Sequence, residues 1–406
     1  MNILFLISSA GHYGMENMLL ALTRNLSRLG CRCIVGVFCD ARDPHTEVAE
    51  EAQKQGLIVE LVHCKGRIDR TAVQQICRLV TKYEIDVVHP HGYKADLYAY
   101  AAAYTNPVAL LATSHNWPSK RLDMRAYAAL DRLVLRRFDS VVAVSEPVHA
   151  TLRRWGVGEE KLALIPNGVD VDRFQNAAPT LRMELGIADA TLVGFVGRLV
   201  PDKGGALLLR VAKQVLTVYP NTRFLFVGEG PSRRDWEQLA SELGIARNVV
   251  FSGTRKDMPN VYASLDMLVL PSLVESMPMC ILEAMASSKP VIATEVGGIS
   301  RVITPHETGF LVRPGDIDGI AKAILLVLEK PDLASKLGKN AHIHIRQNFS
   351  AHVMAKAYVQ VYDAILANHA SGASLAARVE SRKQLHRASG IHQNLSTHSP
   401  SPSPKG

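Results

Sequence analysis

The sequence predicts an α/β protein built from two Rossmann-like domains with a central cleft between them. Short runs rich in Val, Ile, Leu and Phe alternate with amphipathic segments of helical length along most of the chain. This alternation is typical of parallel strands that helices bury on both faces. It stops after residue 168 and resumes at residue 191, and 406 residues are enough for two domains of ordinary size.

The hydrophobic runs predict seven strands in a first domain, which we place at residues 1–168. These strands are expected at residues 3–7, 32–38, 58–62, 87–89, 109–113, 140–144 and 162–165. Asn167-Gly168, a proline and mixed polar residues then indicate a linker at residues 169–190. The second domain is expected at residues 191–370, with strands at 192–196, 223–227, 249–252, 267–270, 291–293 and 310–312. We expect its last helix to cross back toward the first domain.

Composition limits the partners and the compartment. The formal net charge is +8, but about half of this excess lies in residues 371–406, a tail rich in Ser, His, Arg and Pro that we expect to be disordered. Neither folded half is basic enough to indicate binding to nucleic acid. The six cysteines form no CxxC pair or metal-ligand spacing, so a reduced cytoplasmic protein is the simplest interpretation.

The apolar segments predict no transmembrane helix. The run at residues 3–7 lacks a basic leader and is interpreted as a buried strand rather than as part of a signal peptide. The longest apolar stretch, residues 97–113, is interrupted by Asn106-Pro107. Any contact with the inner face of the plasma membrane would therefore be peripheral.

Two glutamates, Glu275 and Glu283, stand eight positions apart after the strand expected at residues 267–270. Residues 279–286 are expected to form a helix, so the turn between the glutamates presents free backbone N–H groups that suit an anion. Glu283 lies about one turn inside that helix, where its carboxylate can reach polar hydroxyls. A helix with two solvated glutamates would be the structural alternative.

A second charged motif follows the strand expected at residues 192–196. Its loop, Gly197-Arg198-Leu-Val-Pro-Asp-Lys203-Gly204, places two cations five positions apart. A guanidinium can grip two phosphate oxygens, and an ammonium neutralises a further charge. Ligands of open α/β sheets bind at the carboxyl ends of the strands, so the loop predicts a diphosphate site rather than incidental surface charges.

These motifs resemble those of the family-4 retaining glycosyltransferases of the GT-B type, which contain two Rossmann-like domains. The hallmark of that family is a Glu-x7-Glu motif preceded by a Gly-Arg-x4-Lys-Gly loop, and both are present here. Further matches are Val144-Ser145, Ile165-Pro166-Asn167-Gly168-Val169-Asp170, Val227-Gly228-Glu229-Gly230-Pro231, Phe251-Ser252-Gly253 and Gly297-Gly298. The resemblance extends from about Asn2 to Leu366 and excludes the tail.

The resemblance implies that the second domain binds a nucleotide sugar and the first domain binds the acceptor. Arg198 and Lys203 would bind the donor diphosphate, Glu283 the ribose hydroxyls, and Glu275 the hydroxyls of the transferred sugar. The remaining donor contacts would come from the turn that holds Met277 and Met279, and from the backbone near the base at Gly253, Thr254 and Arg255.

In the first domain the resemblance implies two further contacts with the donor. The loop Gly11-His-Tyr-Gly14 would pass close to the diphosphate, which a residue without a Cβ permits. His115, in Ala112-Thr-Ser-His115, would be the active-site histidine near the sugar. Together with Arg198, Lys203 and Glu275, His115 completes the implied catalytic set.

The implied activity is retaining transfer of a sugar from a UDP- or GDP-linked donor to a hydroxyl acceptor. Acceptors in bacterial-type polysaccharide, lipid or glycoconjugate synthesis fit this activity, including lipid-linked ones. No cofactor and no metal ion are expected, because the two cations and the helix N-terminus can stabilise the departing diphosphate. An alternative is a protein of the same fold that binds or modifies nucleotide sugars without transferring them.

Two positions depart from the family pattern. The familiar turn after the first glutamate is Gly-Phe-Gly, whereas this chain has Ser276-Met277-Pro278, whose proline lacks an N–H donor. That change leaves the identity of the sugar open. After Gly297-Gly298 the family often has a glutamate where this chain has Arg301.

Other polar pairs carry weaker hypotheses. His89 and His91 end a strand beside the expected cleft and could contact the acceptor, although pocket-lining or purely structural roles are the plainer interpretation. Asp170 and Asp172 form an Asp-x-Asp motif, which another glycosyltransferase fold uses to bind a metal ion. Here they follow Asn-Gly at the start of the linker, which does not favour a metal site.

Four arginines, Arg121, Arg125, Arg132 and Arg136, share one face of a predicted helix. Leucines and alanines that include Leu130 and Leu133 lie elsewhere on it, as a stripe expected to face the core. The arginine face is either simply solvated, or it docks anionic lipid or a polyprenyl-phosphate acceptor.

A nicotinamide-dependent oxidoreductase would share the Rossmann-like architecture. The first strand is not followed by Gly-x-Gly-x-x-Gly, and the nearest approach, Gly228-Glu-Gly230-Pro, lacks the third glycine. The sequence therefore favours a glycosyltransferase.

Overall fold

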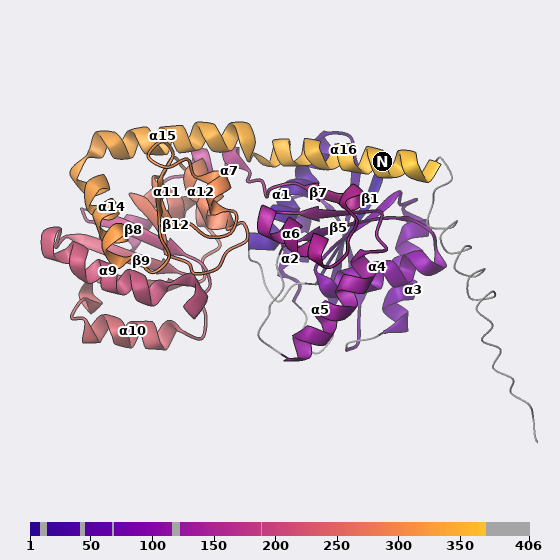
Figure 1. Cartoon of the computed structure of the whole chain (residues 1–406), viewed down its shortest axis with the longest axis horizontal. Coiled ribbons are helices and arrows are strands. Elements are labelled where there is room, and N and C mark those ends of the chain that lie inside the picture. The colour runs from indigo at the N-terminus through magenta and orange to yellow at the C-terminus, as the bar shows by residue number, and fades with distance from the viewer. Residues whose placement is uncertain (9–13, 41–44, 67–68, 116–121, 188, 371–406) are drawn as a thin grey trace, which may run out of the picture.

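The computed structural model describes residues 1–8, 14–40, 45–66, 69–115, 122–187 and 189–370. These residues form two α/β domains, each with a parallel sheet covered by helices (Figure 1). The predicted fold class is confirmed. The tail at residues 371–406 and most of the glycine loop, Gly11 included, lie outside the described residues.

The first domain contains a seven-stranded sheet in the order β3-β2-β1-β4-β5-β6-β7. Its strands are β1 Asn2–Ile7, β2 Arg32–Cys39, β3 Ile58–His63, β4 Val87–His91, β5 Ala109–Ser114, β6 Ser140–Ala143 and β7 Leu162–Leu164. Its helices are α1 Gly14–Arg28, α2 Glu47–Lys54, α3 Arg70–Lys82, α4 Tyr93–Thr105, α5 Leu122–Leu135 and α6 Glu146–Arg154, with a 3₁₀ turn at η1 Glu159–Lys161.

The second domain contains a six-stranded sheet in the order β10-β9-β8-β11-β12-β13. Its strands are β8 Thr191–Val196, β9 Thr222–Val227, β10 Val249–Gly253, β11 Met267–Leu270, β12 Val291–Thr294 and β13 Phe310–Val312. Its helices are α9 Gly205–Val218, α10 Arg233–Glu242, α11 Met258–Ser264, α12 Met279–Ala286, α13 Ile299–Val302, α14 Ile317–Glu329 and α15 Pro331–Asn348, with 3₁₀ turns η2 Pro201–Lys203 and η3 Ala246–Asn248.

Each predicted strand is present, and most ends agree within a residue or two. The central strands are continuous apolar runs because both faces of each sheet are covered: the five residues from Ile3 to Ile7 are fully buried. β4 is longer than predicted, since it continues through Pro90 to His91. In both sheets the strand order reverses beside the first strand, between β1 and β4 and between β8 and β11, where ligands of such sheets bind.

The carboxyl ends of the two sheets meet each other. A Cβ built on Gly14, at the start of α1, would lie 3.2 Å from the Met279 side chain at the start of α12. Farther along, a Cβ on Gly298 would lie 3.1 Å from the Cβ of Ser145, which follows β6. The loops that follow the strands of both domains therefore form one composite surface.

The last helix, α16 Ala351–Ala370, leaves the second domain and packs against α1 of the first (Figure 1). Val169 and Ser350 pair in an isolated bridge where the chain passes between the domains, so the two connections run side by side. A Cβ on Gly168 would lie 2.8 Å from the carbonyl oxygen of Ser350. Glycine at this position allows that close approach.

Two tyrosines fix α16 in the first domain through a buried hydrogen-bond chain. Tyr358 bonds to Thr113, Thr113 bonds to His89, and His89 bonds through its other ring nitrogen to Tyr362, with separations of 2.7–2.8 Å. The hydroxyl groups and ring nitrogens of these four side chains all have hydrogen-bond partners, so their burial leaves no polar atom of the network unsatisfied.

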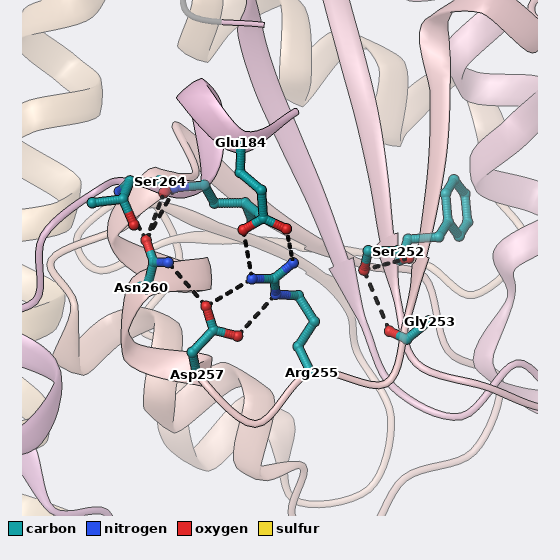
Figure 2. A network of polar contacts seen from close by, with 10 residues as sticks. Glu184, Ser252, Gly253, Arg255, Asp257, Asn260 and Ser264 are labelled. Carbon is teal, nitrogen blue, oxygen red and sulfur yellow. Dashed lines mark hydrogen bonds and ion pairs between the residues drawn. The ribbon is translucent and has the colours of Figure 1, made fainter. Parts of the chain in front are cut away.

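The linker contains two short helices, α7 Val171–Gln175 and α8 Leu181–Glu184, which pack on the second domain. Figure 2 shows how α8 is held: the guanidinium of Arg255 binds both carboxylate oxygens of Glu184 and also binds Asp257. Asp257 in turn accepts a bond from Asn260, whose side-chain oxygen accepts the backbone N–H of Thr180. These contacts anchor the linker to α11.

Candidate active site

The Gly-Arg-x4-Lys-Gly loop begins at the carboxyl end of β8 and passes through the η2 turn. The Arg198 side chain is exposed, and no carboxylate within the described residues pairs with it. Gly204 adopts φ +74°, and a Cβ there would lie 2.0 Å from the carbonyl oxygen of Pro271. This contact, which only glycine allows, brings Lys203 next to the segment that carries Glu275.

Lys203 and Glu275 form an ion pair, with 2.5 Å between Nζ and Oε1. The same carboxylate oxygen accepts a hydrogen bond of 2.8 Å from Ser272. The Glu275 side chain is only 6% exposed, so its charge depends on these two partners. The structure thus joins two residues that the sequence placed in separate motifs.

Backbone contacts brace the Glu275 segment from both sides. The N–H of Leu273 donates to the carbonyl of Asp202, which belongs to η2. Gly297 has φ +61°, and a Cβ there would lie 1.9 Å from the carbonyl oxygen of Glu275. The Gly297-Gly298 turn after β12 therefore supports the acidic loop directly, which gives that motif a physical role.

The turn after Glu275 leads into α12, which spans the predicted residues. Met277 and Met279 are buried, and the carbonyl of Met277 accepts a bond of 3.3 Å from the Asn167 side chain of the first domain. Met279 lies beside Gly14. The start of α12 and the start of α1 therefore approach each other, and each presents backbone N–H groups suited to an anion.

Glu283 lies within α12 and is 5% exposed. Its Oε2 accepts a hydrogen bond of 2.7 Å from Tyr262, a residue of α11 that sequence reasoning did not identify. Burial raises the pKa of the Glu283 carboxyl, and the Tyr262 hydroxyl opposes that shift. A carboxylate can accept several hydrogen bonds, so one bond to Tyr262 leaves capacity for ribose hydroxyls.

Gly253, Thr254 and Arg255 lie at the carboxyl end of β10. Gly253 has φ +72°, and a Cβ there would lie 3.0 Å from the Glu229 carboxylate. The Arg255 side chain is committed to Glu184 and Asp257 (Figure 2). The Arg255 side chain is thus engaged within the protein, and the contact of this backbone with a base stays a prediction.

His115 follows β5 directly, and its ring lies against His91 from β4. Nδ1 of His91 and Nε2 of His115 are 3.4 Å apart. Burial lowers the pKa of His115 to about 4, so the imidazole is neutral at physiological pH. His89 lies deeper, with both ring nitrogens bonded to Tyr362 and Thr113, and is therefore a structural residue rather than an acceptor contact.

Asp170 and Asp172 face different partners. Asp170 pairs with Arg24 of α1 at 2.7 Å, and Asp172 pairs with Arg346 of α15 at 2.9 Å. Within the described part of the chain, no cluster of three His, Cys, Asp or Glu side chains is arranged to hold a metal ion. The two aspartates instead link the start of the linker to both domains.

The predicted core-facing stripe of α5 is only partly confirmed. Val134 is buried as expected, but Leu130 and Leu133 are 47% and 57% exposed, and their assignment to the core is wrong. The guanidinium of Arg132 lies 4.3 Å from the ring centre of Trp155, and Arg136 donates to the Trp155 carbonyl. Arg121 and the side chain of Arg125 lie outside the described residues.

The structure gives a partner to Arg301, the residue that stands where the family often has glutamate. Its guanidinium pairs with Glu146 at the start of α6, at 3.1 Å. Because Glu146 belongs to the first domain and Arg301 to the second, the pair bridges the domains. Both side chains are exposed, so the contribution of this pair to stability is small.

No helix within the described residues is both long and apolar enough to cross a membrane.

Two family models match the chain, one for each domain. The model of the glycosyl transferases group 1 matches residues 179–344, and the model of glycosyltransferase family 4 matches residues 13–173. A relative from Escherichia coli, UDP-Gal:alpha-D-GlcNAc-diphosphoundecaprenol alpha-1,3-galactosyltransferase, is 26% identical over 78% of this chain and 85% of its own. A GDP-mannose-dependent monoacylated alpha-(1-6)-phosphatidylinositol monomannoside mannosyltransferase from Corynebacterium glutamicum is 31% identical over 47% of this chain and 53% of its own.

Solved structures share the whole architecture. Anabaena HepE in complex with UDP and glucose superposes with a TM-score of 0.79 at 23% identity, covering 90% of this chain and 100% of that chain. Sucrose-phosphate synthase from Thermosynechococcus elongatus superposes with a TM-score of 0.76 at 24% identity, over 90% and 99% of the two chains. Since the family matches span both domains and agree with the fold and its ordered motifs, the chain belongs to the family-4 glycosyltransferases of the GT-B type.

Proposed function

We propose that this glycosyltransferase transfers a sugar, with retention of its anomeric configuration, from a nucleotide-diphosphate sugar to a hydroxyl acceptor. The observation that carries the proposal is the loop after β8, at the carboxyl edge of the second sheet. It holds the exposed Arg198, which has no ionic partner within the described residues, and Lys203, which pairs with Glu275. Arg198 and Lys203 would supply two cations for a diphosphate, and Glu275 would supply a carboxylate for sugar hydroxyls. Glu283, one turn inside α12, would hold the ribose.

The chemistry requires stabilisation of the departing diphosphate while the anomeric carbon gains oxocarbenium character. Arg198, Lys203 and the N–H groups at the start of α12 would supply this stabilisation. Lys203 and Ser272 both bond to Oε1 of Glu275, an arrangement that suits a carboxylate that binds sugar hydroxyls. We propose attack on the same face of the sugar, with a donor phosphate oxygen helping to deprotonate the acceptor hydroxyl.

UDP or GDP is proposed as the nucleotide of the donor. The E. coli galactosyltransferase uses UDP-Gal by its name, and the C. glutamicum mannosyltransferase is GDP-mannose-dependent by its name. Both relatives act on lipid-linked acceptors according to those names. These parallels support an acceptor in bacterial polysaccharide, lipid or glycoconjugate synthesis.

An assay of donor turnover tests the proposal against a protein that only binds nucleotide sugars. The enzyme is incubated with UDP- and GDP-sugars, first alone and then with glycosylated lipid diphosphates, and the anomeric proton of the product is followed by NMR. Retention is expected with one nucleotide. Inversion would contradict the proposed mechanism, and binding without hydrolysis or transfer would favour the non-transferring alternative.

We also propose that transfer needs no metal ion. The two cations and the helix N-terminus would do the work that a divalent ion does in other transferases, so activity is expected to persist in excess EDTA. The measurement is the transfer rate before and after chelation. Loss of activity that magnesium or manganese restores would overturn this proposal.

A peripheral membrane contact through α5 would bring the enzyme to a lipid-linked acceptor. Leu130 and Leu133 are exposed beside the exposed Arg132, Arg136 and Arg137. Exposed leucines next to several arginines suit the surface of an anionic bilayer, where each cation contributes about 1 kcal/mol. We accordingly place the enzyme on the inner face of the plasma membrane.

The double change Leu130→Ser and Leu133→Ser is expected to weaken sedimentation with phosphatidylglycerol vesicles while the fold is kept, because both side chains are exposed. Val218→Ser, on α9 of the second domain, removes an equally exposed apolar side chain (58%) and serves as the control. Binding of the parent should also fall as salt rises. Equal sedimentation of the double variant and the parent would mean that this face is simply solvated.

A further inference from the structure

Three imidazoles stack in a column that leads from the centre of the first domain toward the proposed sugar site. The ring centres of His89 and His91 are 4.5 Å apart, and those of His91 and His115 are 5.7 Å apart, with interplanar angles of 30° and 29°. His89 is fixed by Tyr362 and Thr113 through both of its nitrogens. Two hydrogen bonds therefore fix the orientation of the innermost ring.

The rings of His91 and His115 share one hydrogen bond, and the second nitrogen of each ring takes no part in it. Nδ1 of His91 faces Nε2 of His115 at 3.4 Å, a separation that commonly shortens in catalytic sites when a ligand binds. Nε2 of His91 is buried and has no partner among the described residues. Across the residues that the structure describes, nothing bonds to Nδ1 of half-buried His115 either.

The unpartnered nitrogen of His91 decides which ring donates the shared proton. Burial lowers the pKa of both rings, so each is neutral and carries one N–H. If His115 were the donor, the proton of His91 would sit on its Nε2 as a buried N–H without an acceptor. Buried donors without partners are rarer than under-satisfied acceptors. The favoured arrangement leaves Nε2 of His91 bare and makes His91 Nδ1–H the donor.

From this geometry we infer that His91 is a positioning residue that holds His115 in its Nδ1–H tautomer. His115 accepts at Nε2, so its own proton must lie on Nδ1, the nitrogen that remains for a ligand. His115 then presents a hydrogen-bond donor to an oxygen of the transferred sugar and does not serve as the general base. The inference rests on the proposed function for the identity of that ligand.

Two substitutions of His91 separate this role from simple packing. The amide N–H of asparagine can reach the position of Nδ1, whereas phenylalanine keeps the ring and loses the donor. His91→Phe is expected to lower kcat about a hundredfold, the cost of a misplaced catalytic group, with little change in the KM for the donor. His91→Asn should stay within about threefold of the parent, because it keeps the donor that orients His115. His352→Asn, an exposed position on α16, is the control and should match the parent.

The tautomer is measured directly by ¹H–¹⁵N NMR of the histidine rings, without any donor or acceptor present. His115 should be in the Nδ1–H form in the parent and in His91→Asn, and should change form in His91→Phe. An Nε2–H form in the parent would overturn the inference, as would a fully active His91→Phe. Because this readout needs no turnover, it stands or falls independently of the proposed transfer reaction, and the parent spectrum alone is decisive if His91→Phe fails to fold.

Discussion

Replacement of Arg198 by alanine is expected to lower the rate of sugar transfer at least about a hundredfold, as removal of a preorganised charge-stabilising donor does elsewhere. The side chain is exposed and unpaired within the described residues, so its loss leaves no buried group without a partner. The thermal unfolding of the variant should therefore match that of the parent. The measurement is the transfer rate at saturating donor, with the folded state checked by circular dichroism.

Two matched variants sharpen this test. Arg210→Ala removes another exposed arginine of the second domain, on α9, and should leave transfer unchanged. Arg198→Lys keeps the charge and loses the planar fork, so an intermediate rate is expected. Near-normal transfer by a folded Arg198→Ala enzyme would rule out the diphosphate assignment.

The second large effect is expected at Lys203, whose replacement should lower both the rate of transfer and the stability of the fold. Lys203→Ala removes both a cation for the diphosphate and the partner of Glu275, whose side chain is 6% exposed. Transfer should fall at least about a hundredfold. The free energy of unfolding should fall by roughly 1–3 kcal/mol, because within the described residues a largely buried carboxylate would keep Ser272 as its one side-chain partner.

Adding Glu275→Gln to Lys203→Ala distinguishes the two effects. The neutral amide no longer needs a cation, so the double variant should regain much of the lost stability and none of the activity. Lys213→Ala, an exposed lysine on α9, serves as the control. If the double variant were as unstable as Lys203→Ala, the claim that the Lys203–Glu275 ion pair stabilises the Glu275 loop would be wrong.

The strands were predictable because parallel sheets covered on both faces need continuous apolar runs, which stand out in the sequence. The β4 strand was predicted too short because proline lacks the N–H of a sheet hydrogen bond, yet Pro90 is followed by His91 in the same strand. On α5, the helical period shows which residues share a face but not which face meets the core. The exposure of Leu130 and Leu133 is set by the neighbouring elements.

The charged candidates of the donor site were identifiable from motifs, but their partners were not. Ser272 and Tyr262, which bond to Glu275 and Glu283, are ordinary residues whose importance comes from the fold. The contact between His91 and His115 depends on the register of β4 and β5. The same holds for Arg301, whose partner lies 155 positions away in the other domain.

The central claim, that the second domain holds a nucleotide-diphosphate sugar through Arg198, is tested most directly by thermal unfolding in the presence of UDP-, GDP- and ADP-sugars. A ligand that binds only the folded state, present at about a hundred times its Kd, adds about 2.7 kcal/mol to the free energy of unfolding. We expect a UDP- or GDP-sugar to raise the Tm of the parent and to leave that of Arg198→Ala nearly unchanged. The claim would be contradicted if no nucleotide sugar raised the Tm of the parent, or if the same one raised that of Arg198→Ala equally.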